Sequence, residues 1–281
     1  MNKWSFTVTN VTDKMKIGTY LKSKLGLTSA MITSVKFGGV FLNGENVHMR
    51  ALVSEGDKID VILPDEKSEG IEAMDIPLDV LFEDEYILAV NKPCGMPTHP
   101  SKGNHLPTLA NAVMGRYSGN FVFRAINRLD RDTSGVVLLA KDRFTAAKLS
   151  KYMREYHINK RYLAIVRGVP EPRCAIIEAP IKREAEDSIK RIVRPDGKYA
   201  KTEYRVMYQR DSESSVCEII LYTGRTHQIR VHMAHIGHPL VNDFLYDTNP
   251  SGETYKLHCS AITFTHPITE ESITITAPAD F

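Results

Sequence analysis

Hydrophobic positions along the chain fall into short runs that predict more strands than helices. Apolar stretches at residues 86–90, 136–140, 162–166 and 216–221 have the length of buried strands, and residues 273–276 add a further candidate. In contrast, the 143–156 segment carries apolar side chains at helical spacing. Because helices are fewer than strands and do not strictly alternate with them, the pattern favours an α+β domain with a mixed, largely antiparallel sheet.

The first 62 residues have a different pattern, in which two short helices precede a hairpin. Apolar spacing predicts one helix over residues 17–25 and a second over residues 28–35, which Thr28 can cap. Asn43-Gly44, which follows the short apolar run of residues 40–42, is a strong hairpin signal. We therefore expect a separate small domain of α/β type at this end of the chain.

Charge marks the boundary between the two domains. The total of 36 Lys and Arg against 34 Asp and Glu gives a net charge of only +2. Residues 1–62 carry eight basic and five acidic residues, residues 63–86 one and nine, and residues 87–281 27 and 20. The acidic segment predicts an exposed linker, so we expect domains at 1–62 and 75–281 joined by residues 63–74.

In the total, the negative charge of the linker region offsets the positive net charge of the two domains. Within the larger one, residues 141–210 hold 18 basic and nine acidic residues. Such a local excess is what binding to a polyanion requires, although a mixed solvated surface would look similar. Charge alone leaves these two interpretations open.

Composition and topology signals indicate a cytoplasmic protein. Hydrophobic residues make up 42% of the 281 residues and charged residues 25%, which is ordinary for a globular chain. There is no apolar run long enough for a transmembrane helix and no apolar signal core near the start, so we expect no membrane partner. Cysteines 94, 174, 217 and 259 lie far apart, which disfavours a disulfide framework or a zinc ribbon.

The small domain resembles the αL RNA-binding module, the S-four-like domain of ribosomal proteins. The resemblance covers residues 14–61 and includes the string GGVFLNGENVHMRALVSEGDKI. Its helical part is rich in lysine where the family usually has arginine. The resemblance implies that RNA phosphates are bound by Lys14, Lys16, Lys22, Lys24 and Lys36. A domain used only for protein contacts is the alternative.

Three blocks in the larger domain combine charged, aromatic and glycine residues. The first, NRLDRDTSG at residues 127–135, places Asp130 and Asp132 in a polar turn before a predicted buried strand, a common way to present a side chain at a sheet end. The second, NKRYLAIVRG at 159–168, places two basic residues directly before a predicted strand. The third, LYTGRTHQIRVH at 221–232, holds several cationic side chains near a glycine. An arginine close to a functional aspartate would hold that carboxylate ionised.

Together with VNKPCGMPTHPS and LHCSAITFTHP, these blocks resemble RluA-type RNA pseudouridine synthases in content and order. The match covers residues 75–281, and the RLDRDTSG and TGRTHQIRVH strings are highly specific. Two departures stand out. Asn127 replaces the family's usual His, and Asn242 precedes Asp243 where the family usually has Gly. We expect these to affect substrate detail rather than activity.

The resemblance implies an isomerase that converts a uridine of RNA to pseudouridine without metal, redox cofactor or nucleotide. Its catalytic aspartate maps onto Asp130, its base-contacting tyrosine onto Tyr162, and its aspartate-pairing arginine onto Arg225. Asp130 would act either as a nucleophile or in proton transfers around a glycal intermediate. The target base would flip out of its stack to be reached. Substrate contacts are expected from Arg128, Lys160, Arg161, His227, Gln228 and Arg230.

The RNA partner is expected to be ribosomal, with transfer RNA as the second choice, and the default state is a monomer. Three other functions compete. A metal site could use His227, His232, His235 and His238, but their spacing does not match a zinc hydrolase. An aspartic-protease loop would need two Asp-Thr-Gly-like strings, and only one imperfect copy exists at residues 132–135. An RNA-binding assembly factor without turnover is the third, and an intact Asp130, Tyr162 and Arg225 set argues against it.

Overall fold

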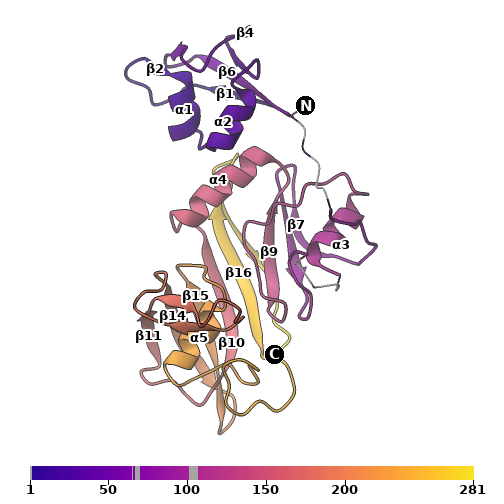
Figure 1. Ribbon diagram of the computed structural model, residues 1–281, viewed down its shortest axis with the longest axis vertical. Coiled ribbons are helices and arrows are strands. Elements are labelled where there is room, and N and C mark those ends of the chain that lie inside the picture. Colours follow the sequence, from indigo (N-terminus) through magenta and orange to yellow (C-terminus); the bar gives the residue numbers. More distant parts are fainter. Residues whose placement is uncertain (1, 65, 67–69, 101–106) are drawn as a thin grey trace.

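The computed structural model describes residues 2–64, 66, 70–100 and 107–281. The small N-terminal module and a larger body, elongated along one direction, are stacked end to end (Figure 1). No described helix is long and apolar enough to cross a membrane.

Both predicted helices and the hairpin of the N-terminal module are confirmed. The helices are α1 (Ile17–Ser23) and α2 (Ser29–Val35), and the Thr28 hydroxyl accepts a hydrogen bond from the Met31 N–H at the start of α2. A strand missed by the sequence pattern, β1 (Asn2–Thr7), pairs with β6 (Lys58–Leu63). The four-stranded sheet has the order β1-β6-β3-β4, and its other members are β3 (Val40–Leu42) and β4 (Glu45–Asn46). A separate pair joins β2 (Met15–Lys16) and β5 (Leu52–Val53).

A nine-stranded sheet forms the larger body, in the order β11-β14-β15-β10-β16-β9-β8-β7 with β17 paired to β16. Of its described pairs, β9–β16 is parallel and the others are antiparallel, which confirms the predicted class. Its strands are β7 (Asp79–Glu83), β8 (Ile87–Lys92), β9 (Ser134–Ala140), β10 (Asn159–Arg167), β11 (Cys174–Glu178), β14 (Lys201–Gln209), β15 (Ser214–Leu221), β16 (Leu257–Thr265) and β17 (Ser272–Thr276).

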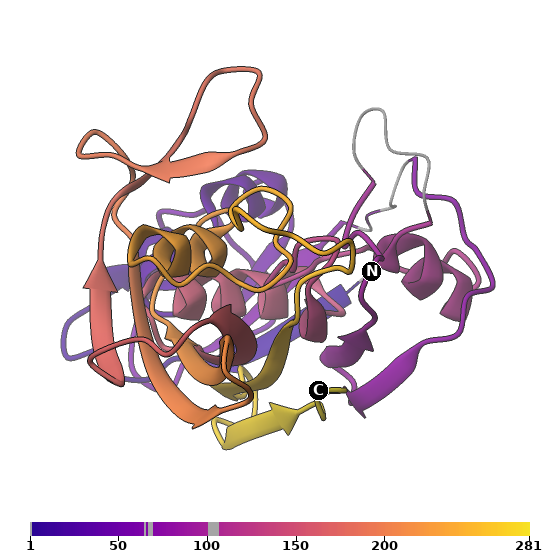
Figure 2. The same cartoon turned by 90° about the horizontal axis from the view of Figure 1, so that it is seen from below.

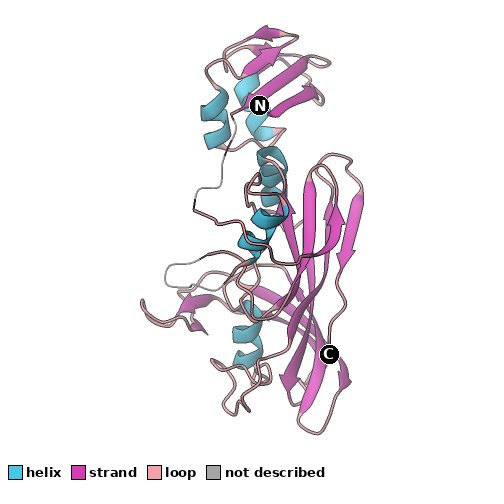
Figure 3. Cartoon of the chain, turned by 90° about the vertical axis from the view of Figure 1, so that its right-hand side faces the viewer, coloured by secondary structure: helices cyan, strands magenta, loops and turns pink. Residues whose placement is uncertain are grey.

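Helices α3 (Leu109–Arg116), α4 (Arg143–Arg154) and α5 (Gln228–His235) lie on one face of this sheet (Figure 3). Sequence patterning predicted α4 and missed α3 and α5. The hairpin of β12 (Ile181–Arg183) and β13 (Arg191–Val193) stands away from the main sheet (Figure 2).

Gly135 allows β9 and β16 to come together in the middle of the sheet. It has a φ of +107°, and a Cβ at this position would collide with the backbone of Cys259. Any larger residue would therefore push β16 away from β9. Since Cys259 also pairs with Tyr162 of β10, this close approach fixes three strands that carry the site.

The linker, predicted as an exposed connection, contacts the larger body at several points. The carboxylate of Glu66 pairs with Arg124 at 2.6 Å and with Arg143 at 3.0 Å. Further along, the Asn111 side chain donates a hydrogen bond to the Glu72 carbonyl at 2.8 Å. The acidic character of this segment is thus partly neutralised by arginines of the larger body.

The N-terminal module does not have a hydrophobic core entirely its own. Phe144 and Ala147 from α4 are buried in the same cluster as Ile17, Leu21 and Val61. The Phe144 ring lies 5.1 Å from that of Trp4 and 5.0 Å from that of Phe6, measured between ring centroids. Helix α4 therefore belongs to both parts of the molecule.

This shared core predicts a stability defect in Phe144→Ala. Truncating a buried phenylalanine costs about 3–5 kcal/mol, because the lost contacts leave a cavity. Urea unfolding should show this decrease. The matched control, Phe37→Ala, removes a ring that is 83% exposed and should change the free energy of unfolding by less than about 0.5 kcal/mol. Equal stabilities of the two variants would contradict the shared core.

Candidate active site

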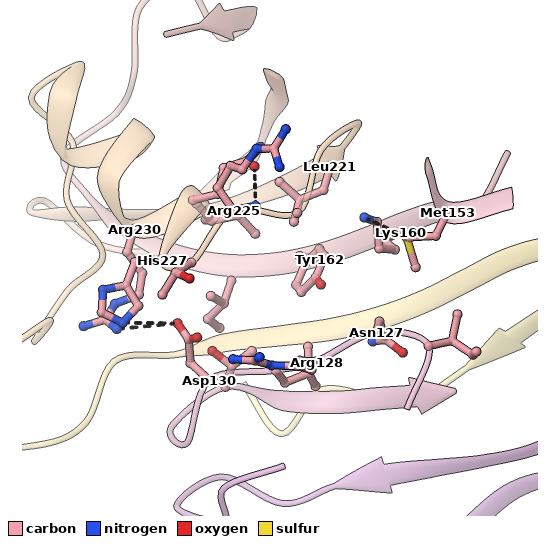
Figure 4. Close-up of a pocket in the computed structure, with 18 residues that line it drawn as sticks. Asn127, Arg128, Asp130, Met153, Lys160, Tyr162, Leu221, Arg225, His227 and Arg230 are labelled. Carbon is pink, nitrogen blue, oxygen red and sulfur yellow. Dashed lines mark hydrogen bonds and ion pairs between the residues drawn. The ribbon is translucent and has the colours of Figure 1, made fainter. Parts of the chain in front are cut away.

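Asp130 lies in the turn before β9 and faces a cavity of about 320 Å³ (Figure 4). Its side chain is 32% exposed, and the turn closes through a hydrogen bond from the Thr133 N–H to the Asp130 carbonyl at 3.1 Å. The cavity is lined from this turn, from α4, from β10 and from the segment that leads into α5. Segments far apart in sequence thus meet at the cavity that Asp130 faces.

Two buried residues that sequence analysis gave no role hold this turn in place. The Lys92 ammonium, 0% exposed, donates hydrogen bonds to the carbonyls of Pro93, Met96 and Arg131 at 2.7–3.0 Å. The Thr98 hydroxyl donates to the Leu129 carbonyl at 2.8 Å. Burial lowers the pKa of Lys92 to about 8. The VNKPCGMPTHPS string contained both residues, but nothing in their spacing indicated contact with a loop some 30 to 40 positions later.

Arg230, not Arg225, is the arginine beside Asp130. Its Nη1 lies 3.6 Å from Asp130 Oδ2, and its Nε and Nη2 bind the two carboxylate oxygens of Asp243 at 2.6 and 2.7 Å. Both Arg230 and Asp243 are buried. Although desolvation opposes the charge, hydrogen bonding to Asp243 keeps the pKa of Arg230 well above its ordinary value. A bidentate pair of this kind fixes the guanidinium plane.

The predicted pairing of Arg225 with Asp130 is wrong. Arg225 lines the cavity, but its Nε donates to the Tyr199 carbonyl at 2.9 Å. Figure 4 shows its guanidinium pointing away from Asp130. The reason is local: Arg225 lies in the turn before α5, whereas Arg230 lies within the helix on the face toward Asp130. A bare sequence string does not tell which of two nearby arginines faces inward.

Aromatic rings surround the Arg230 guanidinium. Its carbon lies 4.6 Å from the ring centroid of Tyr255, 5.2 Å from Tyr246 and 5.5 Å from Phe244. Such cation–π contacts stabilise the charge where water is excluded. Arg230 is therefore held from several sides.

His227 is the second cationic candidate near Asp130. Its Nε2 is 3.9 Å from Asp130 Oδ2, and its Nδ1 is 3.0 Å from the Tyr246 hydroxyl. Burial lowers the pKa of His227, although the nearby Asp130 opposes this shift. The lowered pKa favours the uncharged imidazole, which can contribute hydrogen bonds rather than a positive charge.

Strand β10 separates its predicted site residues by face. Lys160 and Tyr162 line the cavity, while Arg161 points to the other side and lies 3.5 Å from Glu218. The predicted substrate contact of Arg161 in this cavity is therefore wrong, because neighbouring side chains of a strand point to opposite faces. Tyr162 is 5% exposed, and burial raises the pKa of its hydroxyl well above the ordinary value.

Gln228 also differs from expectation. It lines the cavity, yet its side-chain oxygen accepts from the Thr223 hydroxyl and the Arg225 N–H, and its nitrogen donates to Lys201 and Thr202. Since its polar atoms already have partners within the protein, Gln228 shapes the turn before α5. Arg128, in contrast, is exposed at the rim of the cavity beside Asp130 (Figure 4).

The two departures from the family strings both have structural roles. Asn127 is buried and bridges the Val136 carbonyl and the Leu138 N–H with its amide. Asn242 has a φ of +66°, a conformation that Asn tolerates better than most residues other than Gly. The next residue, Asp243, is the partner of Arg230, so this second position bears on the site more directly than we expected.

Two more of the four histidines considered as metal ligands, His232 and His238, have other contacts. The ring nitrogens of His232 lie 2.9 Å from the Thr202 hydroxyl and 2.9 Å from the Ala179 carbonyl, and His238 Nδ1 donates to the Arg167 carbonyl. In the part of the chain that the structure describes, no group of three or more His, Cys, Asp or Glu side chains is placed to hold a metal ion.

Comparison with known proteins identifies the family. The sequence profile described as RNA pseudouridylate synthase matches residues 86–235, which include Asp130, Tyr162 and Arg230. The chain belongs to this family. It is an RNA pseudouridine synthase, and its relatives named below place it with the RluA type, as the sequence strings predicted.

Several relatives are similar over most of this synthase. An uncharacterized RNA pseudouridine synthase of Bacillus subtilis, YjbO, is 38% identical over 91% of this chain and 92% of its own. The ribosomal large subunit pseudouridine synthase D of Xanthomonas campestris is 36% identical over 87% and 78%. Among solved structures, human RNA pseudouridylate synthase domain containing 1 superposes with a TM-score of 0.61 at 25% identity, covering 73% of this chain and 84% of its own.

The geometry of this synthase predicts that Arg230→Lys impairs turnover far more than Arg161→Lys. Lysine cannot span Asp130 and Asp243 with a planar fork, and loss of a group that stabilises charge in the site costs about 100-fold or more. Arg161 serves as the control because it is an arginine of the same domain whose side chain points away from the cavity, toward Glu218. Rates of pseudouridine formation in cell RNA would test this, and equal rates for the two variants would contradict the role of Arg230.

Proposed function

We propose that the protein isomerises a uridine of large-subunit ribosomal RNA, with Asp130 as the essential carboxylate. The observation that carries this assignment is the Asp130–Arg230–Asp243 chain of charges at a cavity lined by Tyr162. Support for the RNA class comes from relatives named as ribosomal large subunit pseudouridine synthases. Transfer RNA is the second candidate.

The reaction exchanges one bond of the base for another. The bond from ribose C1′ to N1 of the uracil breaks, the base turns, and C5 bonds to C1′. The C5 proton leaves and N1 gains one, so that substrate and product have the same atoms. Asp130 acts either by attack on C1′ or through proton transfers around a glycal, and both routes require an ionised carboxylate. Arg230, itself fixed by Asp243, places a positive charge beside that carboxylate and orients it.

Access to the cavity requires the uridine to leave its stack. A cavity of about 320 Å³ has room for a nucleoside but not for a helix, which supports flipping of a single nucleotide. Tyr162 provides an aromatic surface for the uracil ring. Arg128 at the rim is placed to bind the RNA next to the flipped nucleotide.

In this proposal the N-terminal module, residues 1–62, is an αL RNA-binding domain. Its five proposed phosphate ligands are all exposed: Lys14, Lys16, Lys22, Lys24 and Lys36. Lysines bind phosphates as point charges and add affinity that depends on salt rather than on sequence. The enzyme would work as a monomer, because the groups proposed for the reaction all come from one chain. The proposed reaction gives no step to a metal or cofactor.

Replacement of Asp130 by Asn is expected to abolish pseudouridine formation while RNA binding persists. The amide keeps the shape of the side chain but removes the charge that pairs with Arg230. Pseudouridine mapping of total RNA from a deletion strain, complemented with wild-type or Asp130→Asn protein, tests this and names the target. An unchanged modification pattern with the variant would refute the role of Asp130, and a site outside ribosomal RNA would refute the RNA class.

Replacing all five module lysines by Gln is expected to weaken RNA binding and to reduce its salt dependence. Each lost phosphate contact lowers the slope of log affinity against log salt by about 0.7–0.9. Point substitutions are preferable to deletion of the module, since deletion would expose Phe144. Lys58→Gln, an exposed lysine on β6, is the control. Equal slopes for the five-fold variant and the control would contradict the proposed module function.

A further inference from the structure

Lys160 is a buried cation that the chain of charges around Asp130 does not use. It is 5% exposed and lines the cavity. The contact of its ammonium is with a thioether, Met153 Sδ, at 3.5 Å. Among the described residues no carboxylate forms an ion pair with it. Burial lowers the pKa of Lys160 from its ordinary value, which makes the ammonium a stronger hydrogen-bond donor.

An ammonium without an anionic partner is costly to bury, so its position calls for an explanation. The neighbouring side chains do not supply one, because Met153 and Leu221 are apolar, and burial raises the pKa of the Cys259 thiol to about 12 and so keeps it neutral. Lys92, the other fully buried lysine near this site, binds three carbonyls, whereas Lys160 does not have such a set. Unsatisfied charge in a cavity of this kind is typical of groups that meet a ligand.

Position relative to Asp130 indicates which part of the ligand Lys160 meets. Lys160 and Tyr162 are two residues apart on one face of β10, a separation of about 7 Å. Figure 4 shows Tyr162 between Asp130 on one side and Lys160 on the other. A uridine with C1′ at Asp130 and its ring on Tyr162 would direct the far edge of the uracil, with its carbonyl oxygen, toward the Lys160 ammonium.

Charge on the uracil changes during the reaction. When the bond between C1′ and N1 breaks, its electron pair leaves with the base. The detached uracil then carries one negative charge, which is delocalised over N1 and the carbonyl oxygens. The charge disappears when C5 donates an electron pair to C1′. The C5 proton then leaves and N1 gains one, which keeps the base neutral. A fixed donor near a carbonyl oxygen therefore stabilises the detached state more than the bound nucleoside.

We propose that Lys160 is a catalytic residue that stabilises the negative charge of the detached uracil by a hydrogen bond from its ammonium to a carbonyl oxygen. The ammonium keeps its proton throughout and does not form a covalent bond. This inference rests on the proposed function, since it assumes that a uridine occupies the cavity beside Asp130.

The test compares two leaving groups in Lys160→Met. A transcript of the mapped target RNA is prepared once with uridine and once with 5-fluorouridine, whose base carries negative charge more readily. Single-turnover consumption of each nucleoside is followed by mass spectrometry after digestion. We expect Lys160→Met to slow uridine by about 100-fold, the effect of removing one donor to developing charge, and 5-fluorouridine at least about tenfold less.

Further measurements separate chemistry from folding and binding. Because methionine replaces an unpaired buried charge with an apolar group, the melting temperature should equal or exceed that of the wild type. RNA affinity should match that of the control Lys58→Met. Lys160→Gln, which keeps a neutral donor, should fall between wild type and Lys160→Met on uridine, and it replaces Lys160→Met if the latter does not fold.

Outcomes against the inference are distinct from outcomes against the proposed function. Equal slowing of both substrates in the variant, or no slowing on uridine, would overturn the role of Lys160 while the synthase activity stands. Wild-type protein that does not convert the uridine transcript would overturn the proposed function and this inference with it.

Discussion

The guanidinium of Arg230 is the contact on which the rest of the site depends. It joins a buried aspartate, Asp243, to the solvent-accessible Asp130, and three aromatic rings enclose it. Asp243 neutralises the arginine well enough to keep it buried, and Asp130 remains accessible from the cavity. If Asp243 were absent, the arginine would be a buried charge with one distant partner, at a cost of about 3–5 kcal/mol. The carboxylate that we propose as catalytic therefore depends on a second carboxylate that does not line the cavity.

The sheet brings these charges together by strand crossing rather than by sequence proximity. Gly135 lets β9 lie against β16, β16 lies against β10, and β10 carries Tyr162 and Lys160. Lys92 then holds the Asp130 turn through backbone carbonyls. Because each of these contacts involves backbone, this part of the framework does not depend on which side chains line the cavity.

Much of this could be predicted from the sequence, and the limits have physical causes. Runs of buried apolar residues predicted β8, β9, β10 and β15, since a buried strand must be apolar on both faces. The Asp130 and Tyr162 positions followed from specific strings. The pairing arginine did not, because Arg225 and Arg230 differ only in whether the helix has begun. Asp243 and Lys92 were missed because their partners are distant in sequence, and Arg161 because the two faces of β10 were not yet assigned.

Helix α4 imposes an order on how the protein can be assembled. The aromatic surface of Trp4 and Phe6 is synthesised first, but the residue that covers it, Phe144, follows about half a chain later. During synthesis the apolar face of the N-terminal module therefore stays exposed to solvent until α4 leaves the ribosome. Exchanging this module between related enzymes would accordingly require the matching face of α4, so that the unit that evolution can transfer is larger than residues 1–62.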